Sequence, residues 1–460
     1  MTPKPTTKNA TKFWKLGTKD FNTQRFEINT DGELVVREGN YQYNIYDLAR
    51  KFDASIKVFM PFVLEQRLSH LIDTFQNTIK QVGYKGKYTY HFPMKVNQNK
   101  EFVLPMVAEG AHLEVTSANE LWVVKKMWEG ENFYSKIRIL CNGPKTPQYL
   151  KLIQHLEDKN LTITPIIETL DEAELLKSFK GERGVRLNID IKVSSHWDKK
   201  IDRFGLSEKE ILSLGKIRNL KVLHYHMGSQ IAKENDIIAA LRLAFKTYVK
   251  VRKLNPTLDT MDLGGGFAIS YQKKKMYKME TVVKRIVNTL HDLSERAGIP
   301  HPNIITEWGA YIAAPAQFTV FKVVGVKTIP KGVAQKWYIV DGSFMNDLLD
   351  TWAIHQKWHV IPVNRMDAKK KERVWLAGLT CDSDDKYADA DGHVLLPRLE
   401  DVAPGEDMYI AVLDTGAYQD AFAMHHCLLS SPAKVVIQNG LITVTKKRES
   451  PEEIGKMFGW

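Results

Sequence analysis

The sequence predicts an α/β protein in which a (β/α)8 barrel is joined to a C-terminal β-rich domain that includes N-terminal strands. Its 460 residues suit two or three domains, or one large barrel with an accessory domain. From residue 88 onward, short β-rich runs alternate with longer stretches of helical period, which is typical of βαβ units and a parallel sheet. After residue 308 the pattern changes to extended segments separated by turns.

Eight β-rich runs are expected to form the barrel. Helical segments lie between them, for example at residues 237–251 and 279–297, where apolar residues recur at i, i+3, i+4 and i+7. Eight units over roughly 230 residues fit the ~250 residues of a typical barrel better than an open sheet. The expected strands are residues 88–95, 112–117, 137–142, 163–169, 184–190, 221–227, 258–263 and 303–308.

The β domain is expected to draw on both ends of the chain. Residues 26–46 carry an Asp31-Gly32 hairpin signal between two short strands. We therefore assign residues 13–60 to strands that join the β domain, 61–317 to the barrel and 318–460 to a sandwich-like or barrel-like β domain. Its expected strands are residues 318–326, 336–341, 359–364, 374–378, 408–413 and 433–445.

The composition, 43% hydrophobic and 26% charged, excludes a disordered chain or a coiled-coil rod as the main architecture. No run of eighteen apolar residues occurs, and the N-terminus lacks the features of a signal or transit peptide. We expect a cytoplasmic protein without membrane association, beginning with a flexible tail over residues 1–12.

The net charge of +11 is not accompanied by a nucleic-acid motif, and the basic runs are short and lack interleaved aromatic residues. We therefore expect no nucleic-acid partner. Cys141, Cys381 and Cys427 are far apart in sequence and in no CxxC spacing, which argues against a disulfide framework and a zinc cluster. This cysteine usage fits a reducing cytoplasm.

Chemically distinctive residues follow several expected strands, and active sites of such barrels lie at these strand ends. Lys95 ends the first run; it is either a solvated terminus or, in an apolar pocket, a Schiff-base lysine. His224 and His226 share one side of the sixth run, but the further ligands that a metal site needs are missing. A metal is therefore the weaker interpretation.

The last two barrel strands add a candidate phosphate site and a carboxylate. Gly264, Gly265 and Gly266 follow the seventh run, where glycine lets backbone N–H groups approach a phosphate closely, and Glu307 ends the eighth. Pyridoxal phosphate needs a lysine for its aldehyde, a cradle for its phosphate and a carboxylate to keep its pyridine nitrogen protonated. The combined set predicts a pyridoxal phosphate site.

Several motifs resemble one known family in content and in order. They are residues 92–98 (FPMKVNQ), 113–121 (LEVTSANEL), 203–207 (RFGLS), 224–231 (HYHMGSQI), 263–267 (LGGGF), 350–352 (DTW), 380–385 (TCDSDD) and 416–419 (GAYQ). From about residue 13 to the last strands, the chain is similar to the fold-type III, alanine-racemase-like pyridoxal phosphate decarboxylases. Within that family it resembles the biosynthetic arginine decarboxylases.

The resemblance implies a role for each matching position in the barrel. Lys95 would form the Schiff base, His226 would stack on the cofactor ring and Glu307 would pair with the pyridine nitrogen. The phosphate would be held by Ser229, Gly264, Gly265, Gly266 and Tyr418.

The resemblance also implies an obligate homodimer with shared active sites, with a higher oligomer left open. Cys381 would reach into the partner subunit's site and reprotonate the α-carbon of the substrate. Asp382 together with Asp350 would bind the distal cation, since carboxylates suit a guanidinium. Cys141 and Cys427 are expected to be buried apolar thiols.

Two features depart from the family pattern. The family commonly has an arginine three residues after the last barrel glutamate, but this chain has Ala310, so phosphate binding must depend on other donors. The helical bundle inserted in long arginine decarboxylases is missing, because residues 318–326 run almost directly into 336–341. No metal site is predicted, and a Mg²⁺ requirement is not indicated by the sequence.

The resemblance implies decarboxylation of L-arginine to agmatine and carbon dioxide in polyamine biosynthesis. A relative acting on ornithine, lysine, diaminopimelate or carboxynorspermidine is an alternative. A non-catalytic regulatory homologue that binds a protein partner is another, although such proteins typically lose the lysine or the cysteine that this chain keeps.

Overall fold

The computed structural model describes residues 5–130, 137–191, 193, 202–272, 277–402 and 405–460. The chain divides into two compact units. The barrel unit comprises Glu65–Ile269 and Met276–Ile312, and the β unit comprises Met1–Leu64, Ser270–Lys275 and Ala313–Trp460. The short excursion at residue 270 was not predicted from the sequence. Within the β unit, the carbonyl of Ser270 accepts a hydrogen bond from Asn22 Nδ2 at 3.0 Å.

The barrel unit contains a closed barrel of eight parallel strands, in the order β10-β11-β12-β5-β6-β7-β8-β9. This arrangement confirms the predicted (β/α)8 barrel and all eight of its strands. Their bounds are β5 Tyr88–Pro93, β6 His112–Val115, β7 Arg138–Cys141, β8 Thr162–Ile167, β9 Arg183–Leu187, β10 Leu220–Tyr225, β11 Thr260–Asp262 and β12 Asn303–Thr306.

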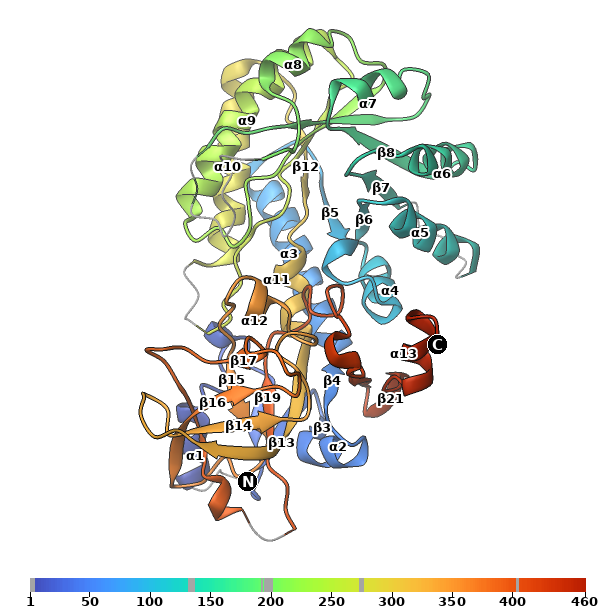
Figure 1. Ribbon diagram of the computed structural model, residues 1–460. Helices are drawn as coiled ribbons and strands as arrows, with labels where there is room; N and C mark the ends of the chain where they lie inside the picture. The colour runs from blue at the N-terminus through green and yellow to red at the C-terminus, as the bar shows by residue number, and fades with distance from the viewer. Residues whose placement is uncertain (1–4, 131–136, 192, 194–201, 273–276, 403–404) are drawn as a thin grey trace. The chain divides into compact units, whose positions relative to one another are not determined.

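Helices connect the barrel strands, and Figure 1 shows α5 beside α6 and α9 beside α10. Helix α10 spans the predicted residues 279–297, and α9 contains the predicted 237–251. The helices are α3 Pro61–Val82, α4 Lys100–Ala108, α5 Ala118–Gly130, α6 Pro147–Asp158, α7 Leu170–Leu175, α8 Glu208–Ser213, α9 Glu234–Leu254, α10 Met279–Ala297 and α11 Gly309–Ala313, with the short 3-10 helix η2 Met94–Val96 after β5.

Apolar side chains fill the interior of the barrel. Leu140, Ile166, Val222 and Ile305 are completely buried and come from four different strands. Gly184 in β9 leaves room for this packing, because a Cβ at that position would collide with Ile166 Cδ1. Polar side chains are buried in the barrel as well, among them His91 of β5 and Thr164 of β8, and the chemically distinctive residues named above follow at the strand ends.

The β unit is built on a ten-stranded mixed sheet with the path β17-β16-β14-β13-β4-β20-β21, to which β15, β18 and β19 are added. Strand β4, from the N-terminal part of the chain, lies between β13 and β20. This pairing confirms that both chain ends form the β domain. The strands are β4 Ile56–Phe59, β13 Gln317–Thr328, β14 Lys336–Val340, β15 Val360–Pro362, β16 Lys371–Ala377, β17 Lys386–Tyr387, β18 Val394–Pro397, β19 Tyr409–Val412, β20 Ala433–Gln438 and β21 Leu441–Lys446.

The first three strands form a separate antiparallel sheet within the β unit. They are β1 Phe26–Ile28, β2 Leu34–Glu38 and β3 Tyr41–Asn44, and β1 pairs with β2 across the predicted Asp31-Gly32 turn. The small sheet is attached to the β unit by the 2.7 Å hydrogen bond from Leu34 N to Val363 O. The ring of Phe26 also packs edge-on against Phe318.

Two local predictions were wrong. Residues 433–445 form a hairpin because Asn439 and Gly440 both have positive φ, as a tight Asn-Gly turn requires. Residues 5–13 form helix α1 Pro5–Phe13 instead of a flexible tail. The helix is anchored by the buried Trp14, whose indole N–H donates to Met366 O at 2.8 Å.

Short helices complete the β unit, and none of the described helices is both long and apolar enough to cross a membrane. The helices are η1 Lys19–Phe21, α2 Ile45–Lys51, η3 Ala314–Ala316, α12 Asp350–Ala353, η4 Leu399–Asp401, η5 His426–Leu428 and α13 Pro451–Met457.

Candidate active site

Lys95 lies in η2 immediately after β5, and its ammonium forms a 2.5 Å ion pair with Glu114 Oε2. The two side chains meet because β5 and β6 are neighbours and Pro93 is in register with Glu114. Glu114 is completely buried, whereas the Lys95 side chain is 39% exposed. Burial raises the pKa of Glu114 above its ordinary value, and the nearby Lys95 cation opposes that rise.

A polar network extends from Glu114 to Glu307 across the mouth of the barrel. Asn142, directly after β7, donates from Nδ2 to Glu114 Oε1 at 2.9 Å and to Glu307 Oε1 at 3.4 Å. Burial alone would raise the pKa of Glu307, but His224 and, to a smaller extent, Lys95 and Asp262 lower it below its ordinary value. Glu307 is therefore ionised at neutral pH.

Asp262 at the end of β11 is the neutral counterpart of Glu307. It is completely buried, and burial together with the charge of Glu307 raises the pKa of Asp262 well above its ordinary value. Its Oδ1 also accepts the backbone N–H of Gly264 at 2.9 Å. A protonated Asp262 beside an ionised Glu307 gives the pair a single negative charge, which is far less costly in a buried site than two.

The two histidines of β10 and its exit differ in their surroundings. His224 is buried, with Nε2 3.6 Å from Glu307 Oε1, and burial lowers its pKa. Neither ring nitrogen of His224 has a hydrogen-bond partner in the described part of the chain. His226 is half-buried, its Nδ1 accepts the N–H of Gly228 at 3.1 Å, and burial lowers its pKa well below the ordinary value. His226 is therefore a neutral aromatic ring.

The glycine loop after β11 closely approaches the residues around it. A Cβ on Gly265 would lie 3.0 Å from Glu307 O and 3.2 Å from His226 Nε2. Gly264 and Gly266 have φ values of +62° and +98°, which side chains other than glycine rarely adopt. Glycine therefore leaves space at this loop beside the histidine ring and the backbone carbonyl of Glu307.

These residues fit pyridoxal phosphate. The site offers a lysine on a strand exit, an ionised carboxylate for a protonated ring nitrogen and a neutral histidine ring for stacking. The glycine loop is a cradle that a Cβ would fill, and the ring nitrogens of His224 are unpartnered within the described residues. All of these features lie within the barrel unit.

Ala310, where the family commonly has an arginine, lies in α11 next to Tyr311. Arg67 of α3 donates from Nε to Tyr311 O at 2.8 Å, and its guanidinium lies 4.2 Å from the Tyr311 ring centroid. Its Nη2 is buried without a hydrogen-bond partner among the described residues. A cation is therefore present beside the segment that lacks the family arginine.

Asp350 and Tyr418 belong to the β unit. Asp350 begins α12 and is buried, and its Oδ2 accepts a 2.8 Å hydrogen bond from Gln419 Nε2. Tyr418 has φ +67° and its ring stacks on Phe422 with centroids 5.8 Å apart. The GAYQ segment thus contacts helix α12 of the DTW segment through Gln419 and Asp350.

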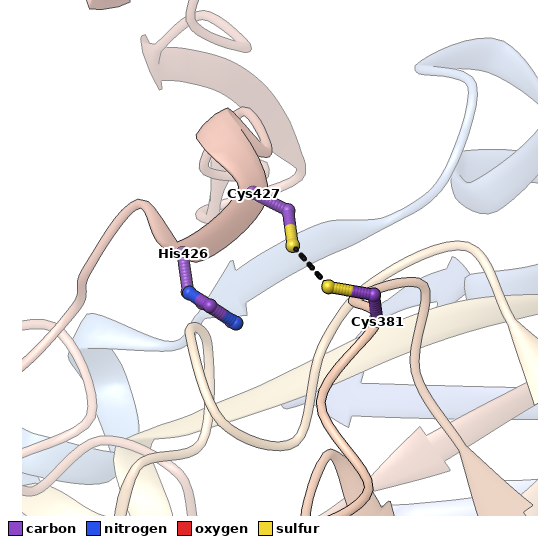
Figure 2. Close-up of side chains that lie close together, drawn as sticks. All are labelled: Cys381, His426 and Cys427. Atoms are coloured by element: carbon purple, nitrogen blue, oxygen red, sulfur yellow. Dashed lines mark hydrogen bonds between the residues drawn. The ribbon is translucent and has the colours of Figure 1, made fainter.

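Cys381 and Asp382 lie in the loop between β16 and β17. Cys381 is exposed, and the Asp382 side chain is 37% exposed. Cys141 is buried as expected, and burial raises the pKa of its thiol to about 12. The expectation for Cys427 was wrong: it is exposed, in a turn with φ +58°, and its sulfur lies 3.4 Å from that of Cys381 (Figure 2).

The barrel unit brings together Lys95, His226, Glu307 and the glycine loop by direct contacts or shared neighbours. Ser229 lies on the turn after β10, between His226 and the backbone pairing of Ile231 with Gly266. Sequence reasoning missed Glu114, Asn142 and Asp262 as parts of this site. A charged residue within an otherwise apolar strand end, as in LEVTSANEL, was the signal that could have revealed Glu114.

The sequence profile of the pyridoxal-dependent decarboxylases, described as their pyridoxal binding domain, matches residues 68–314. This match spans more than half of the chain, so the protein belongs to the pyridoxal-dependent decarboxylase family. The matched segment contains Lys95, His226, the glycine loop and Glu307.

Curated relatives extend the similarity beyond the barrel. The chain is 25% identical to the biosynthetic arginine decarboxylase of Bacteroides thetaiotaomicron, over 88% of this chain and 84% of the relative. It is 24% identical to the enzyme of the same name from Thermosynechococcus vestitus, over 90% and 84% of the two chains. The first alignment spans 536 residues, more than this chain contains, so the relative carries inserted residues.

Solved structures share the fold at lower identity. The biosynthetic arginine decarboxylase SpeA of Campylobacter jejuni superposes with a TM-score of 0.82 at 18% identity, covering 96% of this chain and 92% of that one. Diaminopimelate decarboxylase of M. jannaschii gives 0.80 at 22% identity, covering 94% and 97%. These structures support the barrel and β-domain architecture.

Proposed function

We propose that this chain decarboxylates L-arginine to agmatine and carbon dioxide, the first step of a route to polyamines. The observation that carries the proposal is the match to biosynthetic arginine decarboxylases over 88% of the chain. The ion-paired Lys95 and the ionised Glu307 supply the catalytic groups that such a reaction needs.

In the proposed reaction, Lys95 is the residue that would hold the cofactor through its aldehyde. When bound, pyridoxal phosphate supplies an electron-accepting ring for the electron pair left on the α-carbon as carbon dioxide departs. Glu114 is placed to exchange a proton with the Lys95 amine, because the Glu114 carboxylate is 2.5 Å away and burial raises its pKa.

The other barrel residues bind and orient the cofactor. Glu307 would pair with the ring nitrogen and favour its protonated form, and the neighbouring Asp262 and His224 allow Glu307 to remain the charged member of a buried cluster. The neutral ring of His226 offers a stacking surface. For the phosphate we propose the N–H groups of the glycine loop together with Ser229 and Tyr418, because Ala310 offers no side-chain donor.

We further propose a homodimer in which the β unit completes the site of the partner subunit. Cys381 would then deliver a proton to the α-carbon after decarboxylation, and its exposed thiol is available for that purpose. Asp382 and Asp350 would bind the distal guanidinium of arginine. A carboxylate can accept two parallel hydrogen bonds from a guanidinium but not from an ammonium, so this pairing favours arginine over lysine or ornithine.

A cytoplasmic location is part of the proposal. Cys381 and Cys427 are both exposed with their sulfurs 3.4 Å apart, and thiols in such a position stay reduced only in a reducing compartment.

Carbon dioxide release from purified, cofactor-loaded protein tests the proposed substrate. L-arginine, L-ornithine, L-lysine, meso-diaminopimelate and carboxynorspermidine are compared by kcat/KM under the same conditions. We expect arginine to be preferred by at least tenfold, about 1.4 kcal/mol in transition-state binding. A preference for ornithine or diaminopimelate would contradict the proposal.

Borohydride reduction separates an enzyme from a non-catalytic homologue. We expect a pyridoxyl group on the peptide that contains Lys95, since reduction makes the Schiff base permanent. A loaded protein with the group on another lysine would contradict the role of Lys95.

A further inference from the structure

Three potential metal ligands of the β unit that are far apart in the sequence lie close together in the structure. Cys381 follows β16, and His426 and Cys427 begin η5, some 46 residues later. The two sulfurs are 3.4 Å apart, and the sulfurs and a ring nitrogen of His426 all lie within 4.8 Å of one another. Figure 2 shows both thiols pointing toward each other, with the histidine ring beside them.

The buried turn at residues 344–346 is hydrogen-bonded to both of the loops that carry the proposed ligands. Asp385, four residues after Cys381, accepts the N–H of Phe344 at 2.7 Å and the N–H of Thr380 at 3.0 Å. Two residues further along that turn, Asn346 donates from Nδ2 to the carbonyl of His426 at 2.9 Å. Asp385 and Asn346 are buried, so the approach of the two thiols is fixed by structure on both sides.

The geometry suits a tetrahedral ion better than a disulfide. Two thiolates at ~2.3 Å from a zinc ion, at the tetrahedral angle, are about 3.8 Å apart, which differs little from the observed 3.4 Å. A disulfide would require the sulfurs to approach to about 2.05 Å. The imidazole has no role in a disulfide, whereas it is a common third ligand of zinc.

The surroundings are also favourable for a cation. Asp382 Oδ2 lies 3.9 Å from His426 Nε2, which resembles the carboxylate that usually orients a metal-binding histidine. Asp384 is exposed in the same loop. All three ligands are exposed, so an ion can reach them from solvent.

We propose that Cys381, His426 and Cys427 form a binding site for Zn²⁺, with water or Asp382 as the fourth ligand. Binding replaces the two thiol protons, which pass to solvent, with two sulfur–zinc bonds, and no electron transfer is involved.

Zinc at this site would withdraw Cys381 from catalysis. This consequence rests on the proposed function, in which the Cys381 thiol donates a proton. A bound ion takes up that sulfur, so zinc is expected to inhibit decarboxylation without displacing the cofactor.

Cobalt titration of the reduced full-length protein tests the binding site without reference to activity. We expect one equivalent of Co²⁺ to produce a thiolate-to-cobalt charge-transfer band, and Zn²⁺ to abolish it. In Cys427→Asn the affinity should fall by at least about tenfold, since even outer-shell changes cost about 10–100-fold. Asparagine is chosen because it tolerates the left-handed backbone at this position.

Ser383→Ala, a change in the same exposed loop that removes no ligand, is the matched control and should bind Co²⁺ like the original chain. Retention of the band in a folded Cys427→Asn variant would overturn the proposal. So would a protein that binds no cobalt but forms a Cys381–Cys427 disulfide on mild oxidation.

The activity assay then separates the two proposals. Zn²⁺ should inhibit the original enzyme and Ser383→Ala at least tenfold more strongly than Cys427→Asn, whose basal turnover should be unchanged. Equal inhibition of all three would overturn the link to Cys381. Cobalt binding in a protein that does not act on arginine would refute the proposed function and leave the metal site intact.

Discussion

The mouth of the barrel and the Cys381 loop of the β unit carry similar chemical groups in opposite environments. Glu114 and Glu307 are 0% and 2% exposed, and each is stabilised by neighbours on adjacent strand ends. Asp382 and His426 are 37% and 42% exposed, and Cys381 is exposed beside them. In the barrel site the buried charges are balanced by neighbouring side chains, whereas in the loop the charged groups are exposed to solvent. The barrel mouth therefore suits a cofactor site that is already formed in the single chain. The Cys381 loop suits the proposed contribution to the site of a partner subunit.

The largest effect on turnover is expected from a change in the barrel site. Lys95→Ala should lower arginine turnover by about 10⁴-fold or more, the scale seen when a covalent catalytic group is removed. Circular dichroism should show an unchanged fold, because the side chain is 39% exposed and packs little of the core. Carbon dioxide release close to that of the original enzyme would rule out Lys95 as the covalent group.

Cys381→Ala tests the outward-facing side. Loss of a positioned proton donor should reduce kcat by about 10²–10⁴-fold with little change in cofactor affinity. Cys427→Asn, which alters the neighbouring thiol, is the control and should retain turnover in metal-free buffer. Equal kcat in the original enzyme and Cys381→Ala would show that another group delivers the proton.

A substitution at Asp420 tests whether the β unit also contains buried charges that are balanced by ion pairs. It forms ion pairs with Lys57 at 2.8 Å and Lys434 at 2.6 Å, and all three side chains are less than 10% exposed. Burial alone would raise the pKa of Asp420, but the two lysines outweigh it and lower the pKa. Asp420→Asn should cost about 3–5 kcal/mol of unfolding free energy, because two buried cations lose their partner.

The same ion pairs predict the pH dependence of that stability. Since the pKa of Asp420 is lower in the folded state than in the unfolded chain, its contribution is present at neutral pH and is lost as the pH falls below about 4. In denaturant melts between pH 7 and pH 3, the difference between the original chain and Asp420→Asn should therefore be constant down to about pH 4 and then begin to narrow, by about 1.4 kcal/mol per pH unit. A constant difference across that range would contradict the assignment.

The smallest effect is expected in the glycine cradle. A Cβ on Gly265 would lie 3.0 Å from Glu307 O, so neighbouring atoms must shift slightly. Gly265→Ala should weaken pyridoxal phosphate binding by about tenfold, or 1.4 kcal/mol, measured by fluorescence titration. Gly130→Ala, with no atom within 4 Å of the added Cβ, should bind the cofactor normally. Similar affinities of Gly265→Ala and Gly130→Ala for pyridoxal phosphate would show that the glycine loop can accommodate a Cβ at residue 265.

Much of the fold followed from local patterns. The eight barrel strands were recognisable because apolar runs and amphipathic helices alternate regularly, and Lys95 and Glu307 were identified because they end such runs. The Asn439-Gly440 turn was present in the sequence but was overlooked within a longer extended run. Helix α1 was hidden because its anchor, Trp14, finds Met366 only in the folded chain.

The parts that could not be predicted depend on contacts between distant residues. Glu114 pairs with Lys95 because of the register between β5 and β6, which no single strand reveals. Cys381 and Cys427 meet because two loops are fastened to one turn, through Asp385 and Asn346. The spacing of the cysteines in the sequence therefore argued against any pairing, although the fold places the sulfurs of Cys381 and Cys427 3.4 Å apart.

Subunit complementation tests most directly the claim that the barrel of one chain works with the Cys381 loop of another. Lys95→Ala and Cys381→Ala chains are inactive separately, and each is unfolded, mixed and refolded with the cofactor. Random pairing places one intact site in half of the dimers, so the mixture should recover about a quarter of the original activity. Mass spectrometry of differently tagged chains verifies the exchange. Verified mixed dimers without activity would contradict a site completed by the partner subunit.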